Sequence, residues 1–187
     1  MEEGGSVNKA PKRRTIKIAG FGGQGVVLAS IILGRAAILD GKYSTQTASY
    51  GSESRGGECK SEVAISENQI DYPLVDKVET LVVMSQPALS KYIDDLESAG
   101  TLLVDPDMAP KTPSRDDINI IRVAATKIAE SLGYKITANM VMLGALQAKT
   151  NVVSEKALHE AIKEYVPPKT IDLNIRAAQE GKKLAGK

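Results

Sequence analysis

Apolar and polar positions along this chain repeat with periods that predict strands and one long helix in its first half. Runs rich in β-branched residues, each bounded by turn residues, predict strands over residues 15–19, 43–47, 81–84, 101–104 and 119–123. Between residues 59 and 66 apolar side chains alternate with more polar ones, which predicts a strand with one wetter face near a sheet edge. The run over residues 26–39 is almost entirely aliphatic, so it predicts a helix buried on most of its surface.

Helical patterns dominate the second half of the chain. Residues 87–98 lie between two predicted strands, so we expect a helix there that joins parallel strands by a right-handed crossover. Further helices, the third of them capped by Ser154, are predicted over residues 127–132, 139–148, 154–165 and 171–183. We therefore predict an α/β fold in three layers. It has a mostly parallel sheet with helices on both faces, a Rossmann-like βα start and a helical C-terminal region.

Length and charge limit the domain organisation and the class of partner. The chain has 187 residues, which fits one domain. We expect residues 1–14, which are polar, to be a disordered lead-in and residues 15–187 to form a single domain. Lys and Arg total 24 against 23 Asp and Glu, so a net charge of +1 gives no field that favours nucleic acid or membrane. No apolar run is long enough to cross a bilayer.

Cys59 is the single cysteine of the chain and His159 its single histidine. One cysteine excludes an internal disulfide and any iron–sulfur cluster held by this chain alone, and it suits a reducing cytoplasm. We expect Cys59 to be a small packing residue and His159 to lie on a helix surface. The sequence therefore predicts no metal site and no catalytic residue in this chain.

A glycine turn follows the first predicted strand and precedes the long aliphatic helix. It reads Gly-Phe-Gly-Gly-Gln-Gly over residues 20–25, the G-x-G-x-x-G spacing of turns that bring a phosphate close to the backbone at a helix start. The strand over residues 43–47 lacks the acidic residue that dinucleotide-binding units use, which disfavours NAD. Two roles of the glycine turn remain open: a purely structural turn, or a binding site for a phosphate-bearing ligand. For the second, the candidate binding residues are Gly22, Gly23, Gln24 and Gly25.

A second candidate segment covers residues 49–57 and contains Tyr50, Glu53 and Arg55. The Arg55 guanidinium suits bidentate recognition of phosphate or carboxylate, and Tyr50 adds a phenol beside it. A solvated loop with an internal pair of Arg55 and Glu53 is the structural alternative. Because the carboxyl ends of strands that run the same way share one sheet edge, this loop and the glycine turn are expected to line one crevice.

These segments together resemble a known family. The chain is similar to the gamma subunit of 2-oxoacid:ferredoxin oxidoreductases through residues 20–25, the run QTASYGSESRGG over residues 46–57, and residues 61–66. The resemblance extends from residue 16 to residue 181 and includes matches at residues 71–73, 85–92, 104–106, 139–145 and 174–181. The run that carries Tyr50, Glu53 and Arg55 is far more specific than the glycine turn.

The resemblance implies a multisubunit enzyme of the cytoplasm that decarboxylates a 2-oxoacid oxidatively, joins the acyl group to coenzyme A and passes electrons to ferredoxin. Its complex uses thiamine diphosphate, magnesium, iron–sulfur clusters and coenzyme A, none of them held by this chain alone. The partners it implies are alpha, beta and delta subunits. This chain is expected to pack on the catalytic subunits, to help bind coenzyme A through the glycine turn, Tyr50 and Arg55, and to form a homodimer when isolated.

The subtype follows from positions inside the same run. Pyruvate and branched-chain versions tend to have proline at the position of Ala48 and methionine at the position of Ser54, so the chain looks most like the 2-oxoglutarate type. The pyruvate and branched-chain types remain alternatives. For the loop, the alternative to a ligand contact is that Arg55 and Glu53 only bridge subunits. For the whole chain, the alternative is a stand-alone nucleotide-binding regulator.

Overall fold

The computed structural model describes residues 13–50, 57–72, 75–111 and 113–185. Its centre is a six-stranded sheet with the strand order β2-β3-β1-β4-β5-β6. The strands are β1 (Arg14–Phe21), β2 (Tyr43–Tyr50), β3 (Glu58–Ser66), β4 (Val78–Val83), β5 (Leu96–Val104) and β6 (Asn119–Arg122). The α-helices are α1 (Val26–Leu39), α2 (Gln86–Tyr92), α3 (Ala125–Ser131), α4 (Ala138–Thr150), α5 (Glu155–Tyr165) and α6 (Ile171–Ala185).

The sheet is mixed, with β3 as the strand that runs the other way. Strands β1, β4, β5 and β6 pair in parallel, whereas β3 pairs antiparallel with both β1 and β2. Strand β2 therefore points in the same direction as β1. The connection between β2 and β3 is too short for a helical crossover, which forces antiparallel pairing. The predicted α/β class is confirmed, with this one reversed strand in the sheet.

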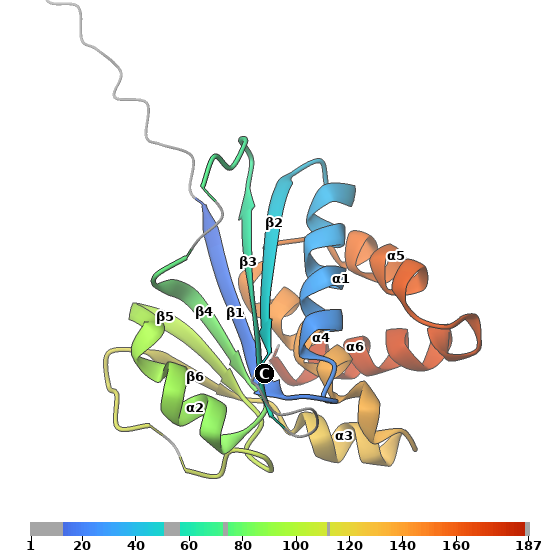
Figure 1. The fold of residues 1–187 in the computed structure, drawn as a ribbon. Helices are drawn as coiled ribbons and strands as arrows, with labels where there is room; N and C mark the ends of the chain where they lie inside the picture. Colours follow the sequence, from blue (N-terminus) through green and yellow to red (C-terminus); the bar gives the residue numbers. More distant parts are fainter. Residues whose placement is uncertain (1–12, 51–56, 73–74, 112, 186–187) are drawn as a thin grey trace, which may run out of the picture.

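Helices cover both faces of the sheet, as predicted. Figure 1 shows α2 on one side and α1, α4, α5 and α6 on the other. Neighbouring residues of β4 belong to different apolar cores, one on each face of the sheet. Val82 packs in the core on the side of α1, α4, α5 and α6, and Val83 packs in the core with Ala88 and Leu89 of α2. This alternation is typical of a strand with both faces buried.

Two expectations about local structure were wrong. The helix expected over residues 87–98 ends at Tyr92, and β5 already begins at Leu96, which pairs with Val78 of β4. Tertiary pairing therefore overrides the local helical pattern there. The expected wetter face of the strand over residues 59–66 is also missing, because Glu62 and Ser66, which lie on that face, are buried. Strand β3 lies one strand in from the edge, and β2 is the edge strand.

Most other predicted elements are confirmed. Helix α1 covers the expected range, and Gly41, in the left-handed region, follows its end. The Ser154 hydroxyl accepts a hydrogen bond from the N–H of Ala157 at the start of α5. Asp40 at the end of α1 in turn accepts hydrogen bonds from the N–H and the hydroxyl of Ser154, at 2.5 and 2.6 Å. The end of α1 and the start of α5 are thus joined.

Helices α4 and α6 pack with their backbones in close approach. A Cβ atom added at Gly144 of α4 would overlap the carbonyl group of Ala178, and one added at Gly181 of α6 would overlap the carbonyl group of Val141. Each glycine therefore provides the space for the other helix.

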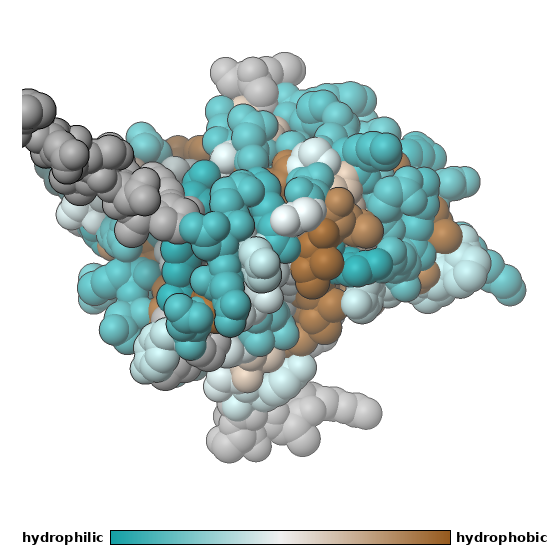
Figure 2. Space-filling view, turned by 90° about the horizontal axis from the view of Figure 1, so that it is seen from above, coloured by the Kyte–Doolittle hydropathy of each residue, from teal (hydrophilic) through white to brown (hydrophobic). Residues whose placement is uncertain are grey.

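The surface seen in Figure 2 is largely hydrophilic but carries an apolar band. Ile38 and Leu39 at the end of α1 are among the exposed apolar side chains of the described chain. Scattered apolar residues are normal on a soluble surface, whereas a contiguous band is a feature of surfaces that meet other proteins. Among the helices described, none has the length and apolarity needed to span a membrane.

Candidate functional site

The glycine turn lies at the carboxyl edge of the sheet, between β1 and α1. In the strand register, Gly20 of β1 and Tyr50 of β2 flank the same residue, Cys59 of β3. The N–H of Gly22 donates to the carbonyl of Gly57 at 2.8 Å, which ties the turn to the segment that leads into β3. The structure therefore brings the described ends of the two candidate segments together at one edge. Arg55 and the rest of residues 51–56 lie outside the described residues.

Gln24 holds the glycine turn in shape. Its side-chain oxygen accepts a hydrogen bond from the N–H of Phe21 at 2.7 Å, and its side-chain nitrogen donates to the carbonyl of Met84 at 2.7 Å. The N–H of Gln24 itself donates to the carbonyl of Phe21 at 3.1 Å. The N–H groups of Gly22 and Gln24 are thus used inside the chain. That of Gly23 makes no hydrogen bond within the described part.

Gly25, the last glycine of the turn, is required by packing. It lies in the left-handed region, with φ of 72°, and directly precedes α1. The side-chain amide of Asn139 donates to the carbonyl of Gly25 at 3.1 Å, and a Cβ atom at Gly25 would overlap that amide. The spacing of the motif therefore reflects close packing between the turn and α4, whatever else the turn does.

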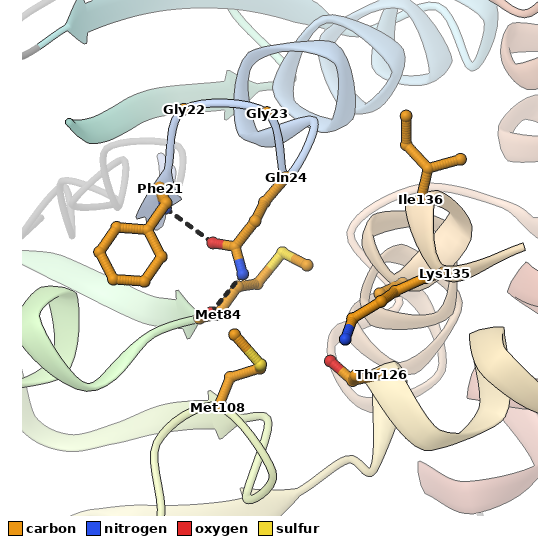
Figure 3. A pocket seen from close by; sticks show the side chains of 10 residues that line it. Phe21, Gly22, Gly23, Gln24, Met84, Met108, Thr126, Lys135 and Ile136 are labelled. Atoms are coloured by element: carbon orange, nitrogen blue, oxygen red, sulfur yellow. Dashed lines mark hydrogen bonds between the residues drawn. The ribbon is translucent and has the colours of Figure 1, made fainter. Parts of the chain in front are cut away.

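A cavity of about 410 Å³ opens beside the turn (Figure 3). Its residues are mostly apolar or uncharged, and they come from the glycine turn, the segments that follow β4 and β5, the start of α3, and the 3₁₀ segment that leads into α4. They are Phe21, Gly22, Gly23, Gln24, Met84, Met108, Thr126, Lys135, Ile136 and Ala138. Lys135 is the one charged residue in this described lining. Such a lining suits a ligand with an uncharged arm and a single anionic region near Lys135.

A buried carboxylate stands behind one wall of the cavity. Asp105, at the carboxyl end of β5, is fully buried and accepts hydrogen bonds from the N–H and the hydroxyl of Thr126, at 2.8 and 2.6 Å. It also accepts one from the N–H of Asp107 at 3.1 Å. Asp105 therefore fixes the start of α3 against the sheet, and it is Thr126 that lines the cavity.

A second hollow of about 240 Å³ adjoins the cavity. Ile136 lines both, and Tyr134 and Leu28 are among the residues of the second. Ile136 and Tyr134 are exposed, at 68 and 58 %. They come from the irregular segment before α4, which contains a short 3₁₀ helix over Lys135–Thr137. No motif marked this segment in the sequence, so its part in the site is visible only in the structure.

The remaining candidate residues have structural surroundings. Cys59 is buried in the core, and burial raises the pKa of its thiol, as for an inert packing residue. His159 is half-buried on α5. Tyr50 is 68 % exposed at the end of the edge strand β2. Within the described ranges, no group of three or more His, Cys, Asp or Glu side chains could hold a metal ion.

Comparison with known proteins assigns the chain to one family of oxidoreductases. The model of the pyruvate ferredoxin/flavodoxin oxidoreductase family matches residues 15–184, and the chain belongs to this family. Among its relatives is the 2-oxoglutarate synthase subunit KorC of Methanothermobacter marburgensis. It is 52 % identical over 92 % of this chain and 96 % of the relative.

Two further comparisons bear on the type of subunit. The keto/oxoacid ferredoxin oxidoreductase gamma subunit of Geobacter sulfurreducens has a TM-score of 0.82 and 40 % identity, over 92 % of this chain and 98 % of that one. The pyruvate synthase subunit PorC of Methanothermobacter marburgensis is 35 % identical over 88 % of this chain and 93 % of the relative. The resemblance to gamma subunits is thus confirmed.

Proposed function

We propose that this chain is the gamma subunit of a 2-oxoglutarate:ferredoxin oxidoreductase of the cytoplasm. The observation that carries this proposal is the 52 % identity to a 2-oxoglutarate synthase subunit over nearly the full length of both chains. The identity to a pyruvate synthase subunit of the same organism is 35 %. In the proposed reaction, 2-oxoglutarate and coenzyme A give carbon dioxide, an acyl-coenzyme A and a proton, and two electrons pass to ferredoxin.

The partners in this proposal are the alpha, beta and delta subunits. Thiamine diphosphate, with its magnesium ion, lies between alpha and beta and performs the carbanion chemistry, and the iron–sulfur clusters lie in other chains. The burial of Cys59 supports this division, because a cysteine packed in a core is not placed to bind a cluster. The exposed apolar residues Ile38 and Leu39 are suited to burial against a partner subunit.

For this chain itself we infer a role in binding coenzyme A, through Gly22, Gly23, Gln24, Gly25, Tyr50 and Arg55. Three features support the inference. The glycine turn and the end of β2 share one sheet edge, the N–H of Gly23 has no partner in the described chain, and the adjoining cavity is mostly apolar. Such a cavity suits the uncharged pantetheine arm. The role of Gln24 is to hold the turn, since both ends of its side-chain amide are bonded within the chain.

Reconstitution of the complex tests the proposed substrate. The four subunits are co-expressed and purified, and reduction of a viologen dye is measured with 2-oxoglutarate, pyruvate and a branched-chain 2-oxoacid. We expect 2-oxoglutarate to give the highest kcat/KM. Preference for either other acid would assign the chain to another type. Failure of the chain to co-purify with larger subunits, together with stabilisation of the isolated chain by ATP or NAD, would favour the nucleotide-binding regulator.

Arg55→Ala in the assembled enzyme tests the coenzyme A role. We expect a raised apparent KM for coenzyme A and an unchanged KM for the 2-oxoacid, because a guanidinium that pairs with phosphate acts on one substrate only. Arg176→Ala, at an exposed position of α6, is the matched control. If Arg55→Ala leaves coenzyme A binding unchanged and weakens co-purification, Arg55 bridges subunits.

A further inference from the structure

Lys135 differs from every other residue that lines the cavity. It is the only charged residue in the described lining, and it lies on the segment before α4, across the cavity from the glycine turn (Figure 3). The surrounding side chains of Phe21, Met84 and Met108 offer no charge and no strong donor. A ligand with an anionic group that enters this cavity therefore meets one ammonium group.

The wall behind Lys135 has acceptors and a negative charge. Figure 3 shows Lys135 and Thr126 pointing toward the same part of the cavity. The hydroxyl proton of Thr126 is donated to Asp105 at 2.6 Å, so Thr126 can only accept a hydrogen bond from the cavity side. The buried carboxylate of Asp105 is hydrogen-bonded to Thr126 and to the N–H of Asp107. Lys135 is therefore the group on this wall that can donate to an anion.

The present partner of Lys135 is easily replaced. Its ammonium lies 3.1 Å from the carboxylate of Glu130, and the two side chains are 66 and 52 % exposed. Exposed ion pairs of this kind contribute little, because water solvates both charges well. Glu130 is not among the residues that line the cavity, so Lys135 connects the cavity to the surface of α3.

We propose that Lys135 binds a phosphate group of coenzyme A in this cavity and exchanges Glu130 for the ligand when it does so. This inference rests on the proposed function. The 3′-phosphate carries more charge than a carboxylate, the diphosphate carries two charges close together, and both accept charge-assisted hydrogen bonds, so the exchange favours the bound state. Glu130 then acts as a competitor that lowers the affinity of the site. Gly23, whose N–H has no hydrogen-bond partner in the described chain, lines the opposite side of the cavity.

The test is equilibrium binding of coenzyme A to the assembled enzyme without a 2-oxoacid, by isothermal titration calorimetry. Lys135→Gln is expected to weaken binding about tenfold, the loss of one charge-assisted contact, and Lys135→Arg to restore most of it. Glu130→Gln is expected to tighten binding severalfold. Lys163→Gln is the matched control, because Lys163 is an exposed lysine that pairs with Glu160 on α5. It should change nothing.

Dephospho-coenzyme A identifies which phosphate is bound. If Lys135→Gln weakens both ligands equally, the contact is to the diphosphate; if it weakens only coenzyme A, the contact is to the 3′-phosphate. The proposal is overturned if Lys135→Gln binds coenzyme A as tightly as the natural enzyme does. It is also overturned if Lys135→Arg is as weak as Lys135→Gln. An enzyme that binds no coenzyme A with Lys135 in place would instead overturn the proposed role of this chain, and this inference with it.

Discussion

Gly144→Ala and Gly181→Ala are expected to destabilise the protein, although alanine is the better helix former. Alanine in a helix interior gains about 1 kcal/mol over glycine. The added methyl group, however, would overlap a backbone carbonyl of the facing helix in both cases. Overpacking costs about 1–3 kcal/mol, and the upper end applies here because a backbone cannot rotate away as a side chain can. The net loss is about 2 kcal/mol, which lowers Tm by about 4–8 °C for a chain of this size.

Gly34→Ala is the matched control for this prediction. Gly34 also lies inside a helix, α1, but a Cβ atom there would meet only the Ser44 hydroxyl, at 3.1 Å. A hydroxyl can rotate, so we expect unchanged stability or a gain of up to about 1 kcal/mol. Thermal unfolding followed by far-ultraviolet circular dichroism measures all three variants. If Gly144→Ala and Gly181→Ala raise Tm as much as Gly34→Ala does, α4 and α6 do not pack as closely as described.

Three further substitutions test other parts of the fold. Burial by itself would raise the pKa of Glu62, but its pairs with Lys17 and Lys60 outweigh burial and lower that pKa. The stabilisation is therefore present above the ordinary carboxyl pKa and lost as pH falls through the lowered one. In urea titrations, Glu62→Gln should be less stable than the natural chain at pH 7, and the gap should close in acid; a gap independent of pH would contradict the pairing. Gln24→Glu should cost about 1–3 kcal/mol, since a carboxylate cannot donate to the Met84 carbonyl. An unchanged urea midpoint would show that the Gln24 side chain does not hold the glycine turn. Asp40→Ala should cost about 1–2 kcal/mol by removing two bonds to the start of α5, and hydrogen exchange should be faster there; unchanged exchange would contradict this.

Features fixed by local chemistry could be predicted from the sequence. The aliphatic run of α1 and the serine cap of α5 depend on residues within a few positions of one another, and both were found. The start of β5 could not be predicted, because Leu96 is extended through its pairing with Val78, far away in the chain. The buried Glu62 was missed for the same reason: one of its partners, Lys17, lies on another strand.

The candidate site shows the same division. The glycine turn was found because its spacing is a local pattern, and its position beside the end of β2 followed from strand direction. Lys135 carries no such pattern: it is an exposed lysine in a short 3₁₀ helix, and only the packing of that segment brings it to the cavity. Whether Tyr50 and Arg55 contact a ligand stays a prediction.

The link between Asp40 and Ser154 has a consequence during synthesis on the ribosome. The two residues are 114 positions apart, so helix α5 emerges long after α1. At about 5–20 residues per second, α1 is made roughly 6–23 s before α5 can pack against it. During this interval buried residues of α1 such as Ile32 and Leu33 lack the part of their core that α5 supplies. The nascent chain therefore exposes an apolar helix that chaperones can bind. Slow translation of the second half would lengthen the time during which this helix can aggregate.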